Sequence, residues 1–214
     1  MFEAAGGSIA WTAFDVVNGD YPPASDPFDA IVISGSKASA YDKTEWILRL
    51  IGYVRDVDIR NQTTSKKVKL VGICFGHQIM AEALGGQVTK NANGWEVGWT
   101  QLQLTDDGMR FFSLSDKQLC IQEMHQDHVS VVPKGFTVLA SSSVSRVQIM
   151  IKSNECIAIQ GHPEYHAGIV REFIRMRAEK NIFSSDQAAQ WLSVVDNQSD
   201  GITIAKRLIQ FIES

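Results

Sequence analysis

The chain has 214 residues and a net charge of −4, with 44% hydrophobic and 21% charged residues, which is the balance of a globular protein. We expect residues 1–214 to form one domain with a sizeable core. The acidic charge argues against nucleic-acid binding, no apolar run reaches the ~20 residues of a membrane span, and three scattered cysteines favour a reducing, cytoplasmic setting.

The first part of the chain predicts alternating helices and strands. Residues 1–7 have the pattern of a helix end capped by glycine, and residues 11–17 alternate enough to predict a strand. A buried strand over residues 29–35 runs into a Gly/Ser loop, and the apolar spacing from Trp46 to Val54 predicts a helix. Residues 69–73 are an apolar run typical of a parallel sheet, and the helical pattern that follows them stops at two glycines.

The second part of the chain is dominated by short strands. The alternating and β-branched segments between turns predict strands over residues 95–105, 118–124, 136–141, 147–152 and 156–160. Helical spacing closes the chain over residues 167–180, 186–195 and 202–212. Together these elements predict an α/β sheet with an antiparallel β insertion in the second half.

Cys74 lies where the strand over residues 69–73 joins its helix. Gly72 and Gly76 flank it two residues away on either side, where a sharp turn needs backbone without Cβ atoms. This is the cysteine form of the nucleophile elbow, G-x-C-x-G in place of G-x-S-x-G. A helix N-terminus and a nearby imidazolium both favour the reactive thiolate. The alternative is an inert core thiol, which is the role predicted for Cys120 and Cys156.

A nucleophilic cysteine that acts on an amide needs a base, and His162 is the best candidate. It follows the strand over residues 156–160, so it is expected at the C-terminal edge of the sheet, where Cys74 also emerges. Glu164 can hydrogen-bond the imidazole and hold its tautomer, and Pro163 stiffens the link. The alternative for any single loop histidine is an ordinary solvated residue.

The oxyanion that forms during amide cleavage needs backbone donors. The N–H of Phe75, directly after Cys74, is one natural donor, and the N–H of Ser36 in the Gly/Ser loop is the candidate for the second. A plain strand-to-helix turn is the alternative for this loop.

The remaining histidines do not predict a metal or cofactor site. His125 and His128 lie three residues apart with one carboxylate between them, which is too few ligands to predict a metal site. We interpret this segment as a loop on the substrate side of the site. His77 is expected in a structural or substrate-facing role on the first turn of the helix after Cys74, and His166 is expected in solvent.

These motifs resemble those of the class I glutamine amidotransferase superfamily, the glutaminase domains with a catalytic triad. Residues 72–78, Gly-Ile-Cys-Phe-Gly-His-Gln, resemble the nucleophile motif, and residues 161–164, Gly-His-Pro-Glu, resemble the His/Glu motif. Residues 33–36 are similar to the oxyanion loop, and residues 124–127 stand where many members carry S-H-G-D. The resemblance implies a flavodoxin-like, mostly parallel sheet flanked by helices. It also implies a γ-glutamyl thioester at Cys74, which water releases after His162 protonates the leaving amine.

The resemblance further implies a small γ-glutamyl substrate that is bound by Gly35, Gln78, His125, Gln126 and Asp127. The oxyanion loop departs from the usual G-G-P and is closer to stand-alone members similar to plant γ-glutamyl peptidases. We expect no synthetase domain after the motifs, and we expect the β/α unit with which family members usually begin to be absent.

Three functions are compatible with this sequence. The first is a cysteine hydrolase of γ-glutamyl amide bonds, in glutamine or in a γ-glutamyl peptide such as a glutathione conjugate. The second is a glutaminase subunit that passes ammonia to a separate synthetase. The third is a non-catalytic interaction protein that keeps the fold. A synthetase or a second copy of the chain are the macromolecular partners that the sequence leaves open.

Overall fold

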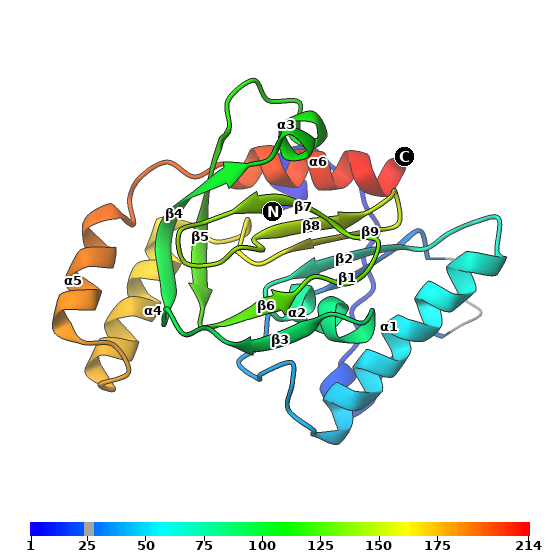
Figure 1. Cartoon of the computed structure of the whole chain (residues 1–214), viewed down its shortest axis with the longest axis horizontal. Helices are drawn as coiled ribbons and strands as arrows, with labels where there is room; N and C mark the ends of the chain where they lie inside the picture. Colours follow the sequence, from blue (N-terminus) through cyan, green and yellow to red (C-terminus); the bar gives the residue numbers. More distant parts are fainter. Residues whose placement is uncertain (24–27) are drawn as a thin grey trace.

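The structure is a computed structural model that describes residues 1–23 and 28–214 (Figure 1). A seven-stranded sheet has the order β1-β2-β9-β8-β7-β4-β5, and β3 and β6 form a second, two-stranded sheet. The strands are β1 (Ala30–Ile33), β2 (Lys69–Ile73), β3 (Gln87–Lys90), β4 (Glu96–Leu104), β5 (Gln118–His125), β6 (Asp127–Val131), β7 (Thr137–Ser141), β8 (Ile149–Lys152) and β9 (Cys156–Ile159). The helices are η1 (Glu3–Ala5), η2 (Val16–Asn18), α1 (Glu45–Thr63), α2 (Phe75–Ala83), α3 (Asp106–Phe112), α4 (Ala167–Glu179), α5 (Ser185–Val194) and α6 (Gly201–Glu213).

Three parallel strands form the part of the sheet that bears the predicted motifs. In β2, Val71 pairs with Val32 of β1 on one side and with Ile157 of β9 on the other. Strands of a parallel sheet are buried on both faces, and their sequences are therefore continuous apolar runs. Because the three strands point the same way, the segments that follow them, which begin at residues 34, 74 and 160, emerge at one edge of the sheet.

The antiparallel strands continue this same sheet. β9, β8, β7, β4 and β5 pair antiparallel in that order, and β4 and β5 turn steeply away from the parallel strands (Figure 1). The predicted α/β class with antiparallel strands in the second half is confirmed.

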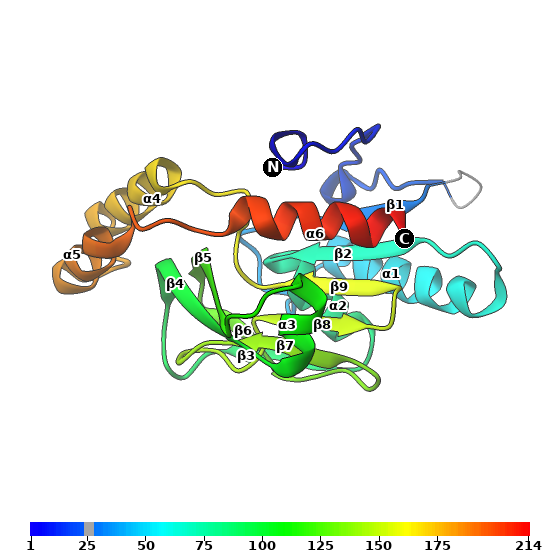
Figure 2. The ribbon, with the colours of Figure 1, turned by 90° about the horizontal axis from the view of Figure 1, so that it is seen from above.

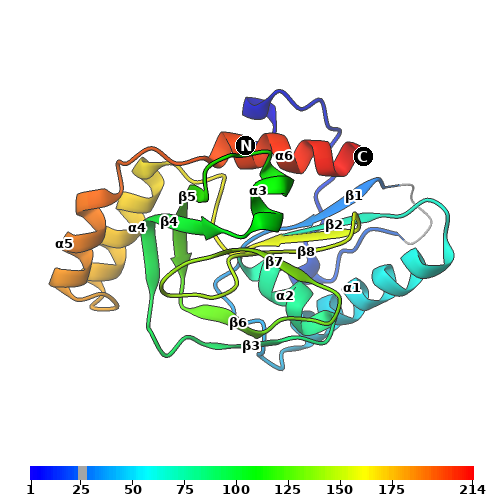
Figure 3. The same cartoon turned by 45° about the horizontal axis from the view of Figure 1, so that its top comes forward.

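Helices cover both faces of the sheet (Figure 2). On one face, Leu70 and Ala158 pack with the apolar stripes of α1 and α2. On the other face, Val71 and Ile157 pack with Leu208 of α6 and with side chains of α3. A separate core joins α4 and α5 to β4 and β5 at the end of the molecule (Figure 3).

The strand predicted over residues 11–17 is wrong. Residues 8–15 form no regular element. The short helix η2 follows them, because the Asp15 side chain accepts a hydrogen bond from the Asn18 N–H and so favours a turn over a strand. Trp11 and Val17 are 49% and 57% exposed, so this segment has no buried apolar face to stabilise a strand. The glycine predicted to end the first helical segment is confirmed, since Gly6 caps η1 at φ 86°. The strands β3 and β6 and the helix α3 were not predicted.

The outer edge of β1 faces a cavity of about 1620 Å³. No strand in the described part of the chain pairs with this edge. The lining includes residues 8–14, residues 28–36 and Phe75, but neither Cys74 nor His162.

None of the described helices is long and apolar enough to cross a membrane.

Candidate active site

Cys74 occupies a strained turn between β2 and α2. Its backbone has φ 53° and ψ −104°, a combination that residues other than glycine rarely adopt. A Cβ on Gly72 would lie 2.6 Å from the Gly76 backbone, and a Cβ on Gly76 would lie 2.1 Å from the Ile33 carbonyl oxygen. The two glycines are therefore needed for this turn, as their spacing in the sequence predicts.

The Cys74 side chain is only 6% exposed. Burial raises the pKa of its thiol to about 12, and the carboxylate of Glu123 acts in the same direction. The backbone N–H of Phe75 opposes this shift, since it donates to the sulfur and favours the thiolate. At neutral pH the sulfur is a thiol, so a reaction at this position needs a base that removes its proton.

His162 lies in a β-turn that also supplies its partner. The Tyr165 N–H donates to the His162 carbonyl oxygen at 3.1 Å, and Pro163 holds the second position of the turn, where its fixed φ is favoured. Within this turn, Glu164 Oε1 lies 2.8 Å from His162 Nδ1. A carboxylate accepts, so Nδ1 carries the proton and Nε2 is the nitrogen that can act as a base.

Gly35 lies against both the cysteine and the histidine. A Cβ placed on Gly35 would be 3.0 Å from His162 Cε1 and 3.6 Å from Cys74 Cβ. The loop after β1, the turn after β2 and the turn after β9 therefore converge on one point. The structure brings together the residues predicted as nucleophile, base, orienting acid and oxyanion loop.

The two predicted oxyanion donors belong to this convergence. Phe75 is the first residue of α2, and its N–H already faces the sulfur of Cys74. Ser36 is exposed in the loop after β1 and follows Gly35 directly. Its hydroxyl accepts from the Ala38 N–H at 3.2 Å, which holds the loop in a tight turn.

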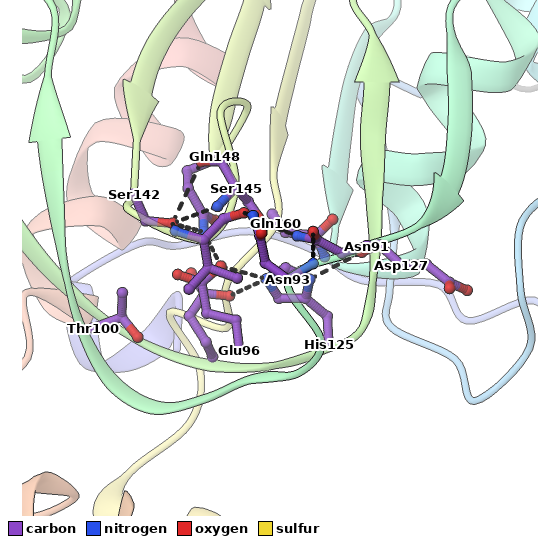
Figure 4. Close-up of polar contacts among 12 residues, drawn as sticks. Asn91, Asn93, Glu96, Thr100, His125, Asp127, Ser142, Ser145, Gln148 and Gln160 are labelled. Carbon is purple, nitrogen blue, oxygen red and sulfur yellow. Dashed lines mark hydrogen bonds and ion pairs between the residues drawn. The ribbon is translucent and has the colours of Figure 1, made fainter.

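The side chains of two predicted substrate-binding residues, Gln78 and His125, are buried and bonded to protein; His125 is drawn in Figure 4. Gln78 Nε2 donates to the Asp127 carbonyl oxygen at 3.0 Å and to Gln160 Oε1 at 3.1 Å. His125 Nδ1 donates to the same Asp127 carbonyl oxygen at 2.9 Å. These side chains hold the backbone at Asp127 in place next to α2.

The Asp127 carboxylate connects this segment to the loop after β1. It accepts hydrogen bonds from Ser39 Oγ at 2.5 Å and from the Tyr41 hydroxyl at 3.1 Å. Gln126 is tied through its carbonyl oxygen, which accepts from the Asn91 N–H at 2.9 Å. The predicted substrate loop is thus fastened at its backbone and at one carboxylate.

A buried acidic cluster lies behind the site. His125 Nε2 is 3.2 Å from Glu96 Oε2 and 3.3 Å from Glu123 Oε2, and all three side chains are at most 3% exposed. Gln148 Nε2 donates to Glu96 Oε2 at 2.8 Å (Figure 4). Burial, with the nearby Glu96 carboxylate, raises the pKa of Glu123 well above its ordinary value. Within the described residues, no group of three or more His, Cys, Asp or Glu side chains is arranged to hold a metal ion.

Glu123 and Tyr165 also belong to the site, and neither was predicted from the sequence. A Cβ on Gly161, the residue before His162, would lie 2.5 Å from Glu123 Oε1, so this carboxyl packs directly beneath the histidine turn. The ring of Tyr165 stacks on the imidazole of His162. Two signals were present: the single acidic residue of the predicted strand over residues 118–124, and an aromatic residue three positions after the histidine across a proline turn.

The fold and this arrangement define an α/β protein with a cysteine elbow and a histidine–glutamate turn at one sheet edge. The family description "Glutamine amidotransferase class-I" matches residues 11–179. A glutamine amidotransferase-like protein of Schizosaccharomyces pombe is 37% identical over 195 residues, which cover 90% of this chain and 76% of the relative. Gamma-glutamyl peptidase 5 of Arabidopsis thaliana is 32% identical, over 87% of this chain and 74% of the relative.

Solved structures agree with this result at the level of the fold. A glutamine amidotransferase from Methylobacillus flagellatus superposes with a TM-score of 0.80 and 23% identity, over 99% of this chain and 86% of that one. The chain therefore belongs to the class I glutamine amidotransferase family. Its family and its relatives support an enzyme of the hydrolase kind.

Proposed function

We propose that this chain is a cysteine hydrolase that cleaves a γ-glutamyl amide bond in glutamine or in a γ-glutamyl peptide. The observation that carries the proposal is the position of Gly35, whose missing side chain leaves a space bounded by Cys74 and His162. The proposal is also supported by several relatives that are named gamma-glutamyl peptidases.

In the proposed mechanism, His162 Nε2 removes the proton of the Cys74 thiol and the sulfur attacks the γ-carbonyl carbon. The developing oxyanion accepts hydrogen bonds from the backbone N–H groups of Phe75 and Ser36. The C–N bond breaks as the imidazolium gives its proton to the leaving amine, which leaves a γ-glutamyl thioester on Cys74. His162 then deprotonates a water molecule that attacks the thioester, the C–S bond breaks and glutamate is released, and the imidazolium returns its proton to the sulfur of Cys74. Throughout, Glu164 fixes the tautomer and orientation of the imidazole.

The burial of Cys74 favours general-base activation over a preformed thiolate–imidazolium pair. A thiol with a pKa of about 12 is neutral before the substrate arrives. The proton then leaves only when the imidazole is aligned to accept it. We further propose that the substrate contacts Gly35, Gln78, His125, Gln126 and Asp127, and that the protein works in the cytosol, where its free cysteines stay reduced.

Glutamate release from glutamine, glutathione and an S-substituted glutathione tests the proposal. We expect release from at least one of the three, and a loss of at least about 1,000-fold in Cys74→Ala and His162→Ala. Cys120→Ser, which changes a thiol near the start of β5, is the control and is expected to retain activity. Folded wild-type protein that releases no glutamate from any of the three substrates would contradict the proposal.

A second candidate is a glutaminase subunit that supplies ammonia to a synthetase. It is favoured by a relative from Saccharolobus solfataricus that is named as a glutamine-hydrolyzing GMP synthase subunit and is 36% identical over 64% of this chain and 68% of the relative. The same assay separates the two candidates. A glutaminase subunit hydrolyses glutamine and not S-substituted glutathione, whereas a γ-glutamyl peptidase shows the reverse preference.

A further inference from the structure

Tyr165 lies face to face with the imidazole that the proposed mechanism charges. The ring centroids of His162 and Tyr165 are 3.9 Å apart and their planes differ by 1°, so the two rings are parallel (the closest ring pair on the site). The same four-residue turn that brings Glu164 to the edge of the imidazole brings Tyr165 to its face. The imidazole thus has one partner in its plane and another above it.

The rest of the fold keeps Tyr165 in this position. Phe173 of α4 meets the Tyr165 ring nearly edge-on, with centroids 5.7 Å apart and an angle of 65°. The tyrosine is therefore held between the histidine turn and a helix from a separate core. Rotation of the imidazole about its χ2 angle would require the tyrosine to move against this helix.

We propose that Tyr165 is a positioning residue for His162, which it holds in the orientation that receives the Cys74 proton and whose imidazolium it stabilises through the face of its ring. This inference rests on the proposed roles of Cys74 and His162. The negative face of an aromatic ring attracts a cation, and the histidine becomes a cation only when the thiol is deprotonated. Tyr165 therefore favours the thiolate–imidazolium state over the neutral pair.

The ring, and not the hydroxyl, makes this contribution. Burial raises the pKa of Tyr165 to about 12, with smaller contributions from Glu164 and Cys74, so the hydroxyl is neutral in the working range. The charged and titratable groups that act on Cys74, His162 or Tyr165 are Glu164 on the histidine turn, Glu123 on β5, Asp127 on β6 and Arg177 on α4. None of these changes in a Tyr165 variant.

The test is the pH dependence of Cys74 alkylation by iodoacetamide, followed by mass spectrometry of the Cys74 peptide. In Tyr165→Leu, which fills the space without a π face, we expect Cys74 alkylation to be about tenfold slower at every pH between 6 and 9, which corresponds to a thiol pKa that is about one unit higher. Tyr165→Phe keeps the ring and is expected to stay within about twofold of the wild type. Tyr53→Leu, which removes a half-buried tyrosine from another ring pair on α1, controls for general destabilisation.

A wild-type rate and pH profile in Tyr165→Leu would overturn the inference, and so would an equal loss in Tyr165→Phe. If Tyr165→Leu does not fold, NMR of the wild type decides: stacking shifts the His162 ring protons upfield, and unshifted protons would refute it. The readout needs no γ-glutamyl substrate. If His162→Ala leaves the rate of Cys74 alkylation unchanged, the proposed function fails. If His162→Ala slows alkylation but Tyr165→Leu does not, only the role of Tyr165 fails.

Discussion

The substitution Gly35→Ala tests whether the three loops converge as the structure describes. The new Cβ would lie 3.0 Å from His162 Cε1, whereas carbon atoms in ordinary contact are about 3.5–4.0 Å apart. The imidazole cannot yield freely, because Glu164 holds its Nδ1 at 2.8 Å and Tyr165 covers its face. We therefore expect the ring or the loop to shift by about 0.5–1 Å, and a misplacement of this size costs roughly 10–100-fold in rate.

The fold should tolerate this change. Gly35 is exposed and its φ lies outside the left-handed region, so alanine adds no backbone strain and the free energy of unfolding should change by less than about 0.5 kcal/mol. The matched control is Gly52→Ala on α1, where a Cβ meets nothing within 4 Å. An alanine there should stabilise the helix by about 0.5–1 kcal/mol and leave the rate unchanged.

The assay for Gly35→Ala combines kcat/KM for glutamate release with the rate of Cys74 alkylation at pH 7. Alkylation reports on the pair of side chains even if the cleaved substrate is not one of the three tested. If Gly35→Ala matches the wild type in both measurements while its melting temperature is unchanged, the residue does not lie between Cys74 and His162, and the reasoning is refuted.

The shifted pKa values of two buried residues, His77 and Glu123, predict how the free energy of unfolding depends on pH. Burial lowers the pKa of His77 to about 3, so the unfolded chain takes up a proton below about pH 6.5 that the folded chain refuses, and stability falls by up to ~1.4 kcal/mol per pH unit on acidification. In urea denaturation at pH 6.5 and 5, His77→Gln should lose about 2 kcal/mol less than the wild type; parallel losses would contradict this. Burial and Glu96 raise the pKa of Glu123, so the folded state keeps its proton longer than the unfolded state and stability falls as pH rises above about 4.3. Glu123→Gln cannot ionise and should gain stability relative to the wild type as the pH rises above about 4.3, and a relative loss on raising the pH would disprove the assignment.

The sequence predicts the parallel strands and their turns well because local rules decide them. The apolar run before Cys74 and the glycines around it leave few alternatives to a buried strand and a sharp turn. The segment around Trp11 was predicted wrongly because alternation alone does not make a strand. A strand also needs a neighbour and a buried face, and these depend on the packing of the whole chain.

The contacts between distant residues are the part of the site that the sequence does not predict. Glu123 reaches Gly161 across 38 positions, and Ser39 reaches Asp127 across 88. Each pair depends on strand order and on how β4 and β5 turn away from the parallel strands. The stacked Tyr165 belongs to a local turn, but a residue three positions away contacts a histidine only in one turn geometry, which the residue types do not fix.

The pairing register between β2 and β9 sets the position of Cys74 relative to His162. Ile73 is paired with Ile159, and the cysteine and the histidine follow their strands by one and three residues. A slip of one residue would move one turn by about 3.3 Å along the other and invert every side chain of that strand. Reactivity at the sulfur is consequently a sensitive reporter of correct strand pairing, and protein that is folded but misregistered would be soluble, compact and inert.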